Sequence, residues 1–268
     1  MTARLLALDV IMRIRDCDEL LPRAFESLAA SGIKPQIILV DNGTQKTAHA
    51  KSYIVKTWLS YSLPSFNYAM AVNMGVPFLD TPYCLIVSPH TFIGNIMAIQ
   101  YAIKFLDENS EFAGLCFSDA LNQGKLSVQL VSKNNFNGWN GLWNTASIYR
   151  SSLLRSRPFN PECFSAEDQE WSHWAIFDQQ LHVGHVLGCE TLNTNQRALS
   201  FKKRLREWAC ISYFAHNEYL RTTCILGTLS RSFRLLRSNP KDATYWLLVS
   251  LTLIKARFIK PSGDSAYY

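Results

Sequence analysis

A β-α-β pattern in the first 40 residues constrains the fold more than any other feature. Residues 5–14 form an almost continuous apolar run, which is typical of a strand covered on both faces. Asp18 can cap a helix whose apolar side chains recur at helical spacing over residues 20–28, and Gly32 can end it. A second apolar run follows at residues 36–40. Two buried strands joined by a helix run parallel with a right-handed crossover, so the pattern predicts an α/β fold.

The same alternation continues along the chain. We expect one α/β domain in residues 1–200, with a mainly parallel sheet flanked by helices, and a basic helical extension in residues 201–268. The expected helices lie at residues 65–79, 97–106 and 166–179, the expected strands at 83–87, 112–118, 126–132 and 182–187, and a loop at 134–141. Beyond residue 200 the sequence predicts two or three helices, with a break at Asn239-Pro240.

Basic charge is concentrated in the extension. Residues 201–260 contain 12 Lys and Arg against 3 Asp and Glu, whereas residues 1–200 contain 15 against 17. Basic helices with Leu, Phe and Ile at helical spacing can lie on an anionic membrane surface, and the alternative is the solvated face of ordinary packing helices. We expect no nucleic-acid partner, because no motif for one accompanies the charge.

Cysteine usage and hydropathy bear on the compartment. Seven cysteines are scattered without a C-x-x-C pair, which argues against a disulfide framework or a zinc knuckle and favours a reducing compartment. We find no signal peptide pattern, and the longest apolar run near the C-terminus, residues 246–254, is far shorter than the roughly 20 residues of a membrane span. We therefore expect a cytoplasmic protein, with peripheral contact to the inner face of the membrane.

Polar side chains follow three of the expected strands. They are Arg13, Arg15 and Asp16 after the first, Asp41 and Asn42 after the second, and Ser88 and His90 after residues 83–87. Ligands of open α/β sheets bind beyond the carboxyl ends of the strands, so these side chains are candidates for one site. The first strand is not followed by the G-x-G-x-x-G of dinucleotide-binding folds.

Five segments follow one another in an order that a known family also shows. The opening strand and helix of that family resemble DVIMRIRDCDELLPRAFESL, and the strand whose Asp commonly contacts the nucleotide base resembles QIILVDNGT. The family's Ala-x-Asn-x-Gly helix resembles FNYAMAVNMGV, with Asn73 at its centre, and YCLIVSPHTFI stands at the place of its D-x-D. The acceptor-side segment with its Glu-Asp pair resembles NTASIYRSSLLRSRPFNPECFSAEDQEW. Over roughly residues 6–200 the chain therefore resembles the family 2 glycosyltransferases.

This resemblance implies a fold and an activity. The fold would be the GT-A fold, a single Rossmann-like domain. The activity would be an inverting transfer of a hexosyl or deoxyhexosyl group from a nucleotide-sugar to a glycan or lipid-linked acceptor, in the synthesis of a surface polysaccharide or glycolipid. The donor-binding residues would be Arg13, Arg15, Asp16, Asp41, Asn42, Asn73, Ser88 and Arg197. The alternative is a non-catalytic sugar-nucleotide-binding or scaffold protein.

Two departures from the family concern the metal. The D-x-D is replaced by Ser88-x-His90, as in some relatives, so the usual carboxylate ligands of Mg²⁺ or Mn²⁺ are missing. The family's downstream His is replaced by the segment Asn195-Gln196-Arg197. His90 can bind one metal ion through its imidazole, which suits Mn²⁺ better than Mg²⁺, or can act in protonated form with the arginines as the cation facing the diphosphate.

The resemblance also implies the catalytic base. Asp168 stands at the start of the expected helix 166–179, where the helix dipole favours an ionised carboxylate, and the alternative is a purely capping role. On the acceptor side we expect Glu167, Trp143 and Trp171. The alternative for these Trp residues, and for Trp139 and Trp174, is core packing, which is more common for aromatic residues at helical spacing.

Overall fold

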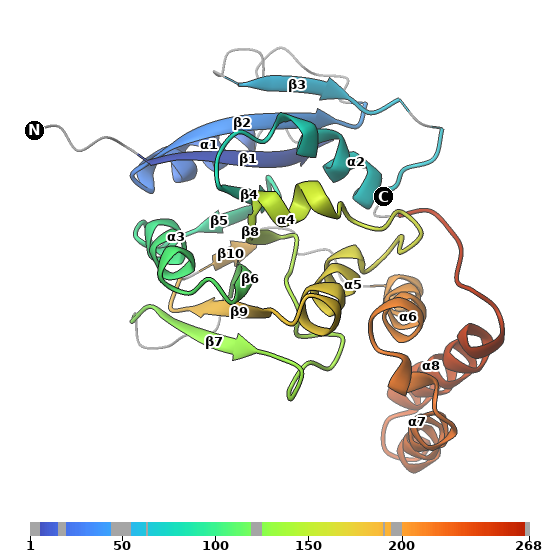
Figure 1. Cartoon of the computed structure of the whole chain (residues 1–268). Coiled ribbons are helices and arrows are strands. Elements are labelled where there is room, and N and C mark those ends of the chain that lie inside the picture. Colours follow the sequence, from blue (N-terminus) through green and yellow to red (C-terminus); the bar gives the residue numbers. More distant parts are fainter. Residues whose placement is uncertain are drawn as a thin grey trace, which may run out of the picture.

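The computed structural model describes residues 6–15, 20–43, 55–62, 64–118, 125–189, 191–193 and 200–265. An eight-stranded sheet in the order β3-β2-β1-β4-β8-β6-β9-β7 forms its centre (Figure 1). Neighbouring strands are parallel from β3 to β4 and between β6 and β9, whereas β8 and β7 are antiparallel to their neighbours. The sheet is therefore mixed but mainly parallel.

The strands agree with the expected pattern and add to it. Their bounds are β1 Leu6–Ile14, β2 Ile33–Asp41, β3 Thr57–Ser60, β4 Tyr83–Val87, β6 Phe112–Phe117, β7 Ser127–Val131, β8 Ala146–Arg150 and β9 His182–Leu187. A separate pair consists of β5 Thr91–Ile93 and β10 Thr191–Asn193. The four strands that the sequence did not predict are β3, β5, β8 and β10, each of five residues or fewer.

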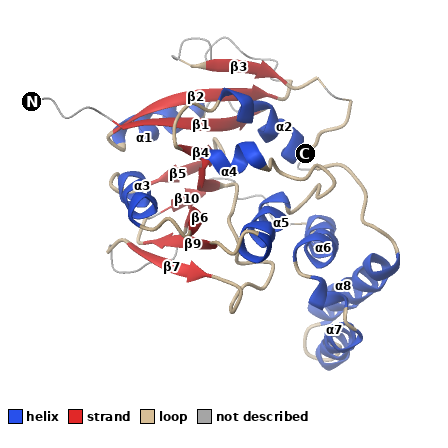
Figure 2. Cartoon of the chain, viewed as in Figure 1, coloured by secondary structure: helices blue, strands red, loops and turns tan. Residues whose placement is uncertain are grey.

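Helices cover both faces of the sheet (Figure 2). On one face α1 Leu21–Ala30 and α3 Ala98–Glu108 bury their apolar sides in one core cluster. On the other face α2 Tyr68–Gly75, α4 Ser151–Ser156 and α5 Glu167–His173 share a second cluster. A 3₁₀ turn at Val76–Phe78 extends α2, and a π-helical turn at Trp174–Asp178 extends α5.

Local chemistry explains where α1 and α2 start and stop. Helix α2 starts after Asn67, whose Oδ1 accepts a hydrogen bond from the backbone N–H of Met70 at 3.0 Å, and packs closely on β1 through Gly75. The strand after α1 follows Gly32, which has a φ of 68° that favours glycine. The predicted cap of α1 was wrong: the N-cap position is Leu20, without a side-chain cap, and Asp18 lies outside the described residues.

Asp9 is a charged residue within the apolar run of β1, and its carboxylate is fully paired. Asp9 is fully buried, its Oδ1 lies 2.7 Å from Lys56 Nζ, and its Oδ2 accepts hydrogen bonds from the backbone N–H groups of Asp80 and Thr81. Burial raises the pKa of Asp9, but Lys56 and these N–H groups outweigh it, so that its pKa is lowered. Asp9 is therefore an internal tie between β1 and the loop before β4.

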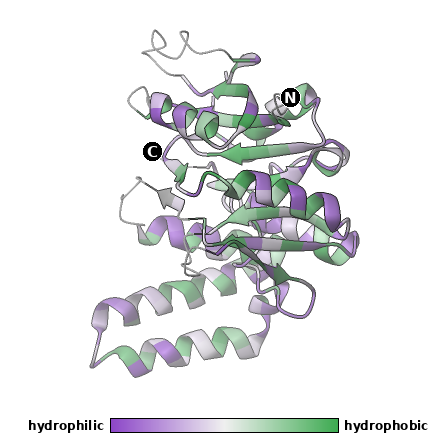
Figure 3. Cartoon of the chain, turned by 90° about the vertical axis from the view of Figure 1, so that its left-hand side faces the viewer, coloured by the Kyte–Doolittle hydropathy of each residue, from purple (hydrophilic) through white to green (hydrophobic). Residues whose placement is uncertain are grey.

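The C-terminal extension is helical, as the sequence predicts. It comprises α6 Phe201–Cys210, a π-helical turn at Ile211–Ala215, a 3₁₀ turn at Asn217–Leu220, α7 Thr222–Leu235 and α8 Pro240–Phe258. Cys210, Ile211 and Ala215 share a small core with residues 163–166 of the domain. Helices α7 and α8 form a hairpin that projects from the rest of the molecule (Figures 1 and 3).

The end of the chain returns to the domain. After α8 the chain runs back to the N-terminal end of α2, where the C-terminus lies in Figure 1. Ser265 is buried there: its N–H donates to Phe66 O at 2.9 Å, its Oγ accepts from the N–H of Tyr68 at 2.9 Å, and its hydroxyl donates to Phe164 O at 2.6 Å. The extension is thus joined to the domain at both of its ends.

Candidate active site

The carboxyl ends of β1, β2 and β4 meet at one edge of the sheet. Ile14 is in register with Asp41, and Ile11 with Ile86, which places Ser88 level with Arg13. The polar clusters predicted from the sequence are therefore brought together as far as the structure describes them. Arg13 is half-buried, Arg15 is exposed directly after β1, and Asp41 is buried at the end of β2.

A tight turn carries Ser88 and His90 from β4 into β5. The backbone N–H of Thr91 donates to Ser88 O at 3.0 Å, and the N–H of His90 lies 3.4 Å from Ser88 Oγ. The N–H of Ser88 donates to Thr145 O at 2.9 Å. This last bond fixes the turn to the segment that leads into β8. Asn144 of that segment binds two acidic residues of α5, which are described next.

Asn144 holds the carboxylates of Glu167 and Asp168 in place. Its backbone N–H donates to Asp168 Oδ2 at 2.9 Å, and its side-chain Nδ2 donates to Glu167 Oε1 at 3.0 Å. The hydroxyl of Tyr149, which is completely buried, donates to Asn144 Oδ1 at 2.7 Å. Asn144 therefore binds both carboxylates, and its neighbour Thr145 is bonded to Ser88 at the end of β4. Neither contact of Asn144 was predicted from the sequence.

Side chains of α5 shape the loop around Asn144. Gln169 Oε1 accepts from the N–H of Gly141 at 2.8 Å, and Ser172 Oγ accepts from the N–H of Leu142 at 2.8 Å. A Cβ at Gly141 would lie 2.6 Å from Ser172 Oγ, so only glycine permits this approach. The predicted loop at 134–141 is confirmed, and its last residues fit against the face of α5 that carries Asp168.

The two carboxylates differ in pKa. Burial, together with the negative charge of Asp168, raises the pKa of Glu167 to about 8. Burial also raises the pKa of Asp168 to about 6, opposed by the N–H groups of Asn144 and Gln169. Glu167 is almost fully buried, whereas Asp168 is half-buried. Burial therefore raises the pKa of both carboxylates, and raises that of the more deeply buried Glu167 further.

A short path of contacts joins Asp168 to Arg13. The hydroxyl of Tyr68 lies 3.3 Å from Asn144 O, and the guanidinium of Arg13 lies over the rings of Tyr68 and Phe66, at 5.7 and 5.1 Å from the ring centres. A cation at the end of β1 and an anion at the start of α5 are thus linked through Tyr68 and Asn144. Such an arrangement suits a reaction in which a proton is removed at one end and negative charge develops at the other.

The extension contributes a third acidic residue. Burial raises the pKa of Glu207 in α6, Lys203 at 3.8 Å lowers it, and the charge of Asp168 raises it further. Glu207 also raises the pKa of Glu167. Glu207 was not predicted from the sequence, because it lies among the basic residues of the extension, for which only a surface role was expected.

Two predicted roles need correction. Asn73 was expected to bind the donor, but its Nδ2 donates to Phe159 O at 2.7 Å and its Oδ1 accepts from the N–H of Phe159 at 3.0 Å. It therefore clamps α2 to the segment that precedes α5. Trp171 was expected to stack on an acceptor, but its side chain is fully buried and its Nε1 donates to Arg157 O at 2.9 Å. It is a core residue.

Of the remaining candidates, the structure describes Trp143 and Asn42. Trp143 is half-buried, with its ring centre 4.6 Å from that of His185. The N–H of Asn42 donates to Ile14 O at 3.0 Å, which ties the ends of β1 and β2. Asp16 and Arg197 lie outside the described residues.

A divalent metal ion is not supported by the side chains at the β4 end. The residues there are a hydroxyl and an imidazole, Ser88 and His90, without a carboxylate. Among the residues that the structure describes, no group of three or more His, Cys, Asp or Glu could hold a metal ion. The described donor set therefore does not fit a metal site formed by the protein alone.

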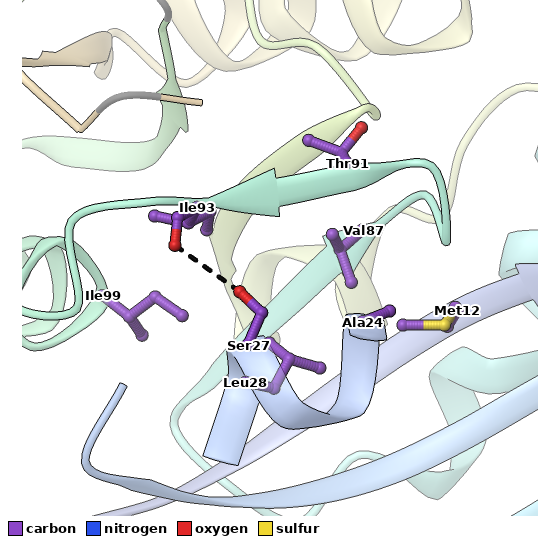
Figure 4. A pocket seen from close by; sticks show the side chains of 8 residues that line it. All are labelled: Met12, Ala24, Ser27, Leu28, Val87, Thr91, Ile93 and Ile99. Atoms are coloured by element: carbon purple, nitrogen blue, oxygen red, sulfur yellow. Dashed lines mark hydrogen bonds between the residues drawn. The ribbon is translucent and has the colours of Figure 1, made fainter. Parts of the chain in front are cut away.

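A small cavity beneath α1 is separate from this site (Figure 4). It is lined by Met12, Leu28, Val87 and Ile99, among others, and its volume of about 10 Å³ is close to the minimum for one water molecule. We interpret it as a packing defect between α1 and the sheet.

The arrangement of sheet and helices is that of the GT-A fold, and comparisons with solved structures agree. The chain is similar to S. aureus TarS, residues 1–349, in complex with UDP, with 17% identity, a TM-score of 0.60, and coverage of 94% of this chain and 81% of that one. It is also similar to the mannosyltransferase PcManGT from Pyrobaculum calidifontis in complex with GDP-Man and Mn²⁺, with 11% identity, a TM-score of 0.63, and coverage of 95% and 86%.

A third similar structure is glucosyl-3-phosphoglycerate synthase from Mycobacterium tuberculosis in complex with Mg²⁺ and UDP. It has 11% identity, a TM-score of 0.55, and coverage of 78% of this chain and 79% of that one. No protein-family model matches the chain, and no curated protein matches its sequence. At these identities the similarity establishes the fold.

Proposed function

We propose that the protein is a glycosyltransferase that moves a sugar from a nucleotide-sugar donor to an acceptor hydroxyl, with inversion at the anomeric carbon. The observation that carries the proposal is the Asp168 carboxylate, held by the backbone of Asn144 beside the β4 end of a GT-A fold. Burial raises its pKa to about 6, so it is ionised at neutral pH yet basic enough to accept a proton.

In the proposed reaction Asp168 takes the proton of the acceptor hydroxyl as the hydroxyl oxygen bonds to the anomeric carbon. The bond from that carbon to the diphosphate oxygen breaks, and the diphosphate leaves with the electron pair. Glu167 is the weaker candidate for the base, because it is more deeply buried and its pKa is raised further, to about 8. It contributes instead to the acceptor side, together with Trp143.

The donor would bind along the ends of β1, β2 and β4. Arg13 and Arg15 suit the diphosphate, because a guanidinium forms bidentate hydrogen bonds with phosphate oxygens. Asp41 and Asn42 at the β2 end suit the nucleoside, and Ser88 at the β4 end lies on the opposite side of β1, level with Arg13. Asp16 and Arg197 remain part of this proposal on the sequence alone.

The class of donor and acceptor is a finer proposal. The similar structures described above are complexes with UDP or GDP-Man, and a UDP-GlcNAc complex of TarS is also similar at 17% identity and a TM-score of 0.57. We propose a hexosyl or deoxyhexosyl donor and a glycan or lipid-linked acceptor of a surface polysaccharide or glycolipid, as in family 2.

His90 is proposed to face the diphosphate. With no carboxylate beside it, the imidazole would act as a cation with the arginines, or as one ligand of a Mn²⁺ or Mg²⁺ ion held mainly by the donor. The proposal that the protein is a non-catalytic sugar-nucleotide-binding scaffold rests on the same missing carboxylates.

One experiment separates these readings. Nucleotide-sugars are screened by thermal shift, because a ligand that binds only the folded state raises its melting temperature. Donor hydrolysis is then measured for each ligand that binds, with and without EDTA. Hydrolysis that EDTA abolishes indicates a metal-dependent enzyme, and hydrolysis that persists indicates catalysis without metal. Binding without hydrolysis or transfer would contradict the proposal that the protein is an enzyme, and would support the non-catalytic scaffold instead.

We also propose that the enzyme works at a membrane surface. The support is the charge of residues 201–260, with 12 basic and 3 acidic residues. Among the described helices, none is long and apolar enough to cross a membrane.

A further inference from the structure

Helix α8 exposes a continuous apolar stripe. Leu247, Leu251, Ile254 and Phe258 are 40%, 53%, 41% and 78% exposed, and they recur at intervals of four, three and four residues, which places them on one face of a helix. The opposite side of α8 carries Val249 and Leu253, which are fully buried near Trp208 of α6. The stripe therefore points away from the domain.

Helix α7 exposes a second stripe on the same side. Leu226 and Phe233 of α7, and Leu236 directly after it, are 56%, 63% and 54% exposed. The helices are antiparallel, since Thr228 Oγ1 lies 2.8 Å from Ser250 Oγ and Ser232 Oγ donates to Ala243 O at 2.7 Å. With these contacts as the shared face, helical periodicity turns both stripes toward the same side of the hairpin. The hairpin of Figure 3 thus has one apolar face built from two helices.

The surroundings of this face are basic. The exposed charged residues within residues 222–258 are Arg231, Arg234, Arg237, Lys241, Lys255 and Arg257, against Asp242. Arg237 directly follows Leu236, and Lys255 directly follows Ile254. A second copy of the chain would bring like charges together across such a face, whereas an anionic lipid surface offers the opposite charge.

We propose that the apolar face of the α7–α8 hairpin docks on an anionic membrane, with its leucine, isoleucine and phenylalanine side chains inserted among the lipids and its basic side chains against the headgroups. This proposal rests on the membrane contact proposed above and assigns it to a surface. From Phe258 the chain continues to Ser265, which is bonded between α2 and the segment before α5. Docking at the hairpin therefore fixes the distance of Asp168 from the lipid surface.

The test uses the full-length chain and two kinds of vesicle, phosphatidylcholine alone and phosphatidylcholine mixed with phosphatidylglycerol. We expect co-sedimentation with the anionic vesicles only, weakening as salt is raised. The double variant Leu251→Ser/Phe258→Ser should bind at least about tenfold more weakly, because two inserted apolar side chains are lost. Ile96→Ser, at a side chain that is 54% exposed before α3, is the matched control and should bind as the wild type does.

Three results would overturn the proposal. The first is no binding of the full-length chain to anionic vesicles at low salt, and the second is equal binding by the double variant. The third is a change of oligomeric state in the double variant by light scattering, which would make the face an interface between copies. Donor hydrolysis is measured on the same samples, so that the two proposals can be tested separately. Vesicle binding without hydrolysis would contradict the proposed enzymatic activity and would still support membrane docking by the hairpin.

Discussion

Glu167 and Asp168 are adjacent in the sequence but differ in the work that each can do. Glu167 is buried against the Asn144 side chain, and Asp168 is half-buried on the Asn144 backbone N–H. Burial and the charge of Asp168 raise the pKa of Glu167 above neutrality, whereas that of Asp168 stays below it. This difference in environment supports the proposal that Asp168 is the base.

Glu167→Gln should change how stability depends on pH. The pKa of Glu167 in the folded state, about 8, lies above its ordinary value of 4.5, so the folded state binds the extra proton between these values. Wild-type stability is then highest below about pH 4.5, as far as this group is concerned, and falls as pH rises toward 8. A glutamine keeps the acceptor for Asn144 and removes the ionisation.

We expect the free energy of unfolding of Glu167→Gln, relative to wild type, to increase by roughly 1–3 kcal/mol between about pH 5 and pH 8. Urea denaturation at the two pH values measures it. Glu108→Gln, at an exposed side chain of α3, is the control and should show no such increase. A difference for Glu167→Gln that does not change with pH would mean that this carboxyl is ionised in the fold.

At this scale the sequence predicted Glu167 and Asp168 but not their partners. The Glu-Asp pair is visible in one stretch of sequence, whereas Asn144, Tyr149 and Glu207 come from segments far apart and meet only in the folded chain. The role predicted for Trp171 was wrong because helical spacing does not show which aromatic rings face the core.

At the scale of elements, the segment after α8 connects α2 to the segment before α5. The Ser265 hydroxyl accepts a hydrogen bond from the backbone N–H of Tyr68, at the start of α2, and donates one to the backbone O of Phe164, before α5. The long strands and helices were predicted from periodicity. The short strands β3, β5, β8 and β10 were not, since three to five residues give too few repeats to distinguish a strand from a loop.

Ser265→Ala should destabilise the protein by roughly 1–3 kcal/mol, because it leaves the part-buried N–H of Tyr68 without its acceptor and the O of buried Phe164 without its donor. Thermal or urea unfolding measures the change. Ser262→Ala, at an exposed position of the same tail, is the matched control. Equal stability of the two variants would show that the tail does not hold α2 and α5 together.

At the scale of the whole molecule, the candidate site lies at the edge where the parallel strands end. Helix α5 adds Glu167 and Asp168 to it, and α6 adds the charge of Glu207 near them. The β-α-β pattern predicted this edge because parallel strands bring their carboxyl ends together. It could not predict that α6 of the extension adds Glu207, since nothing in a local pattern states where a later helix returns.

Asp41→Ala should weaken the binding of free nucleoside diphosphate. Asp41 is buried at the end of β2 and in register with Ile14, next to the arginines of β1. Loss of a hydrogen-bonded carboxylate is expected to reduce affinity by about tenfold or more. Titration calorimetry with UDP and GDP measures it, with Asp178→Asn, exposed after α5, as control. Unchanged affinity would make Asp41 a residue of the turn alone.

The central claim is that Asp168 is the base of a sugar transfer, and the rate of transfer as a function of pH tests it most directly. With a donor that binds, the wild-type rate should rise as pH increases through about 6, where Asp168 loses its proton. Asp168→Asn should lower the rate by about 10²–10⁴-fold and remove this rise while leaving donor affinity nearly unchanged, and Glu108→Gln should behave as wild type. A rate for Asp168→Asn within a few-fold of wild type, with the same pH profile, would contradict the account.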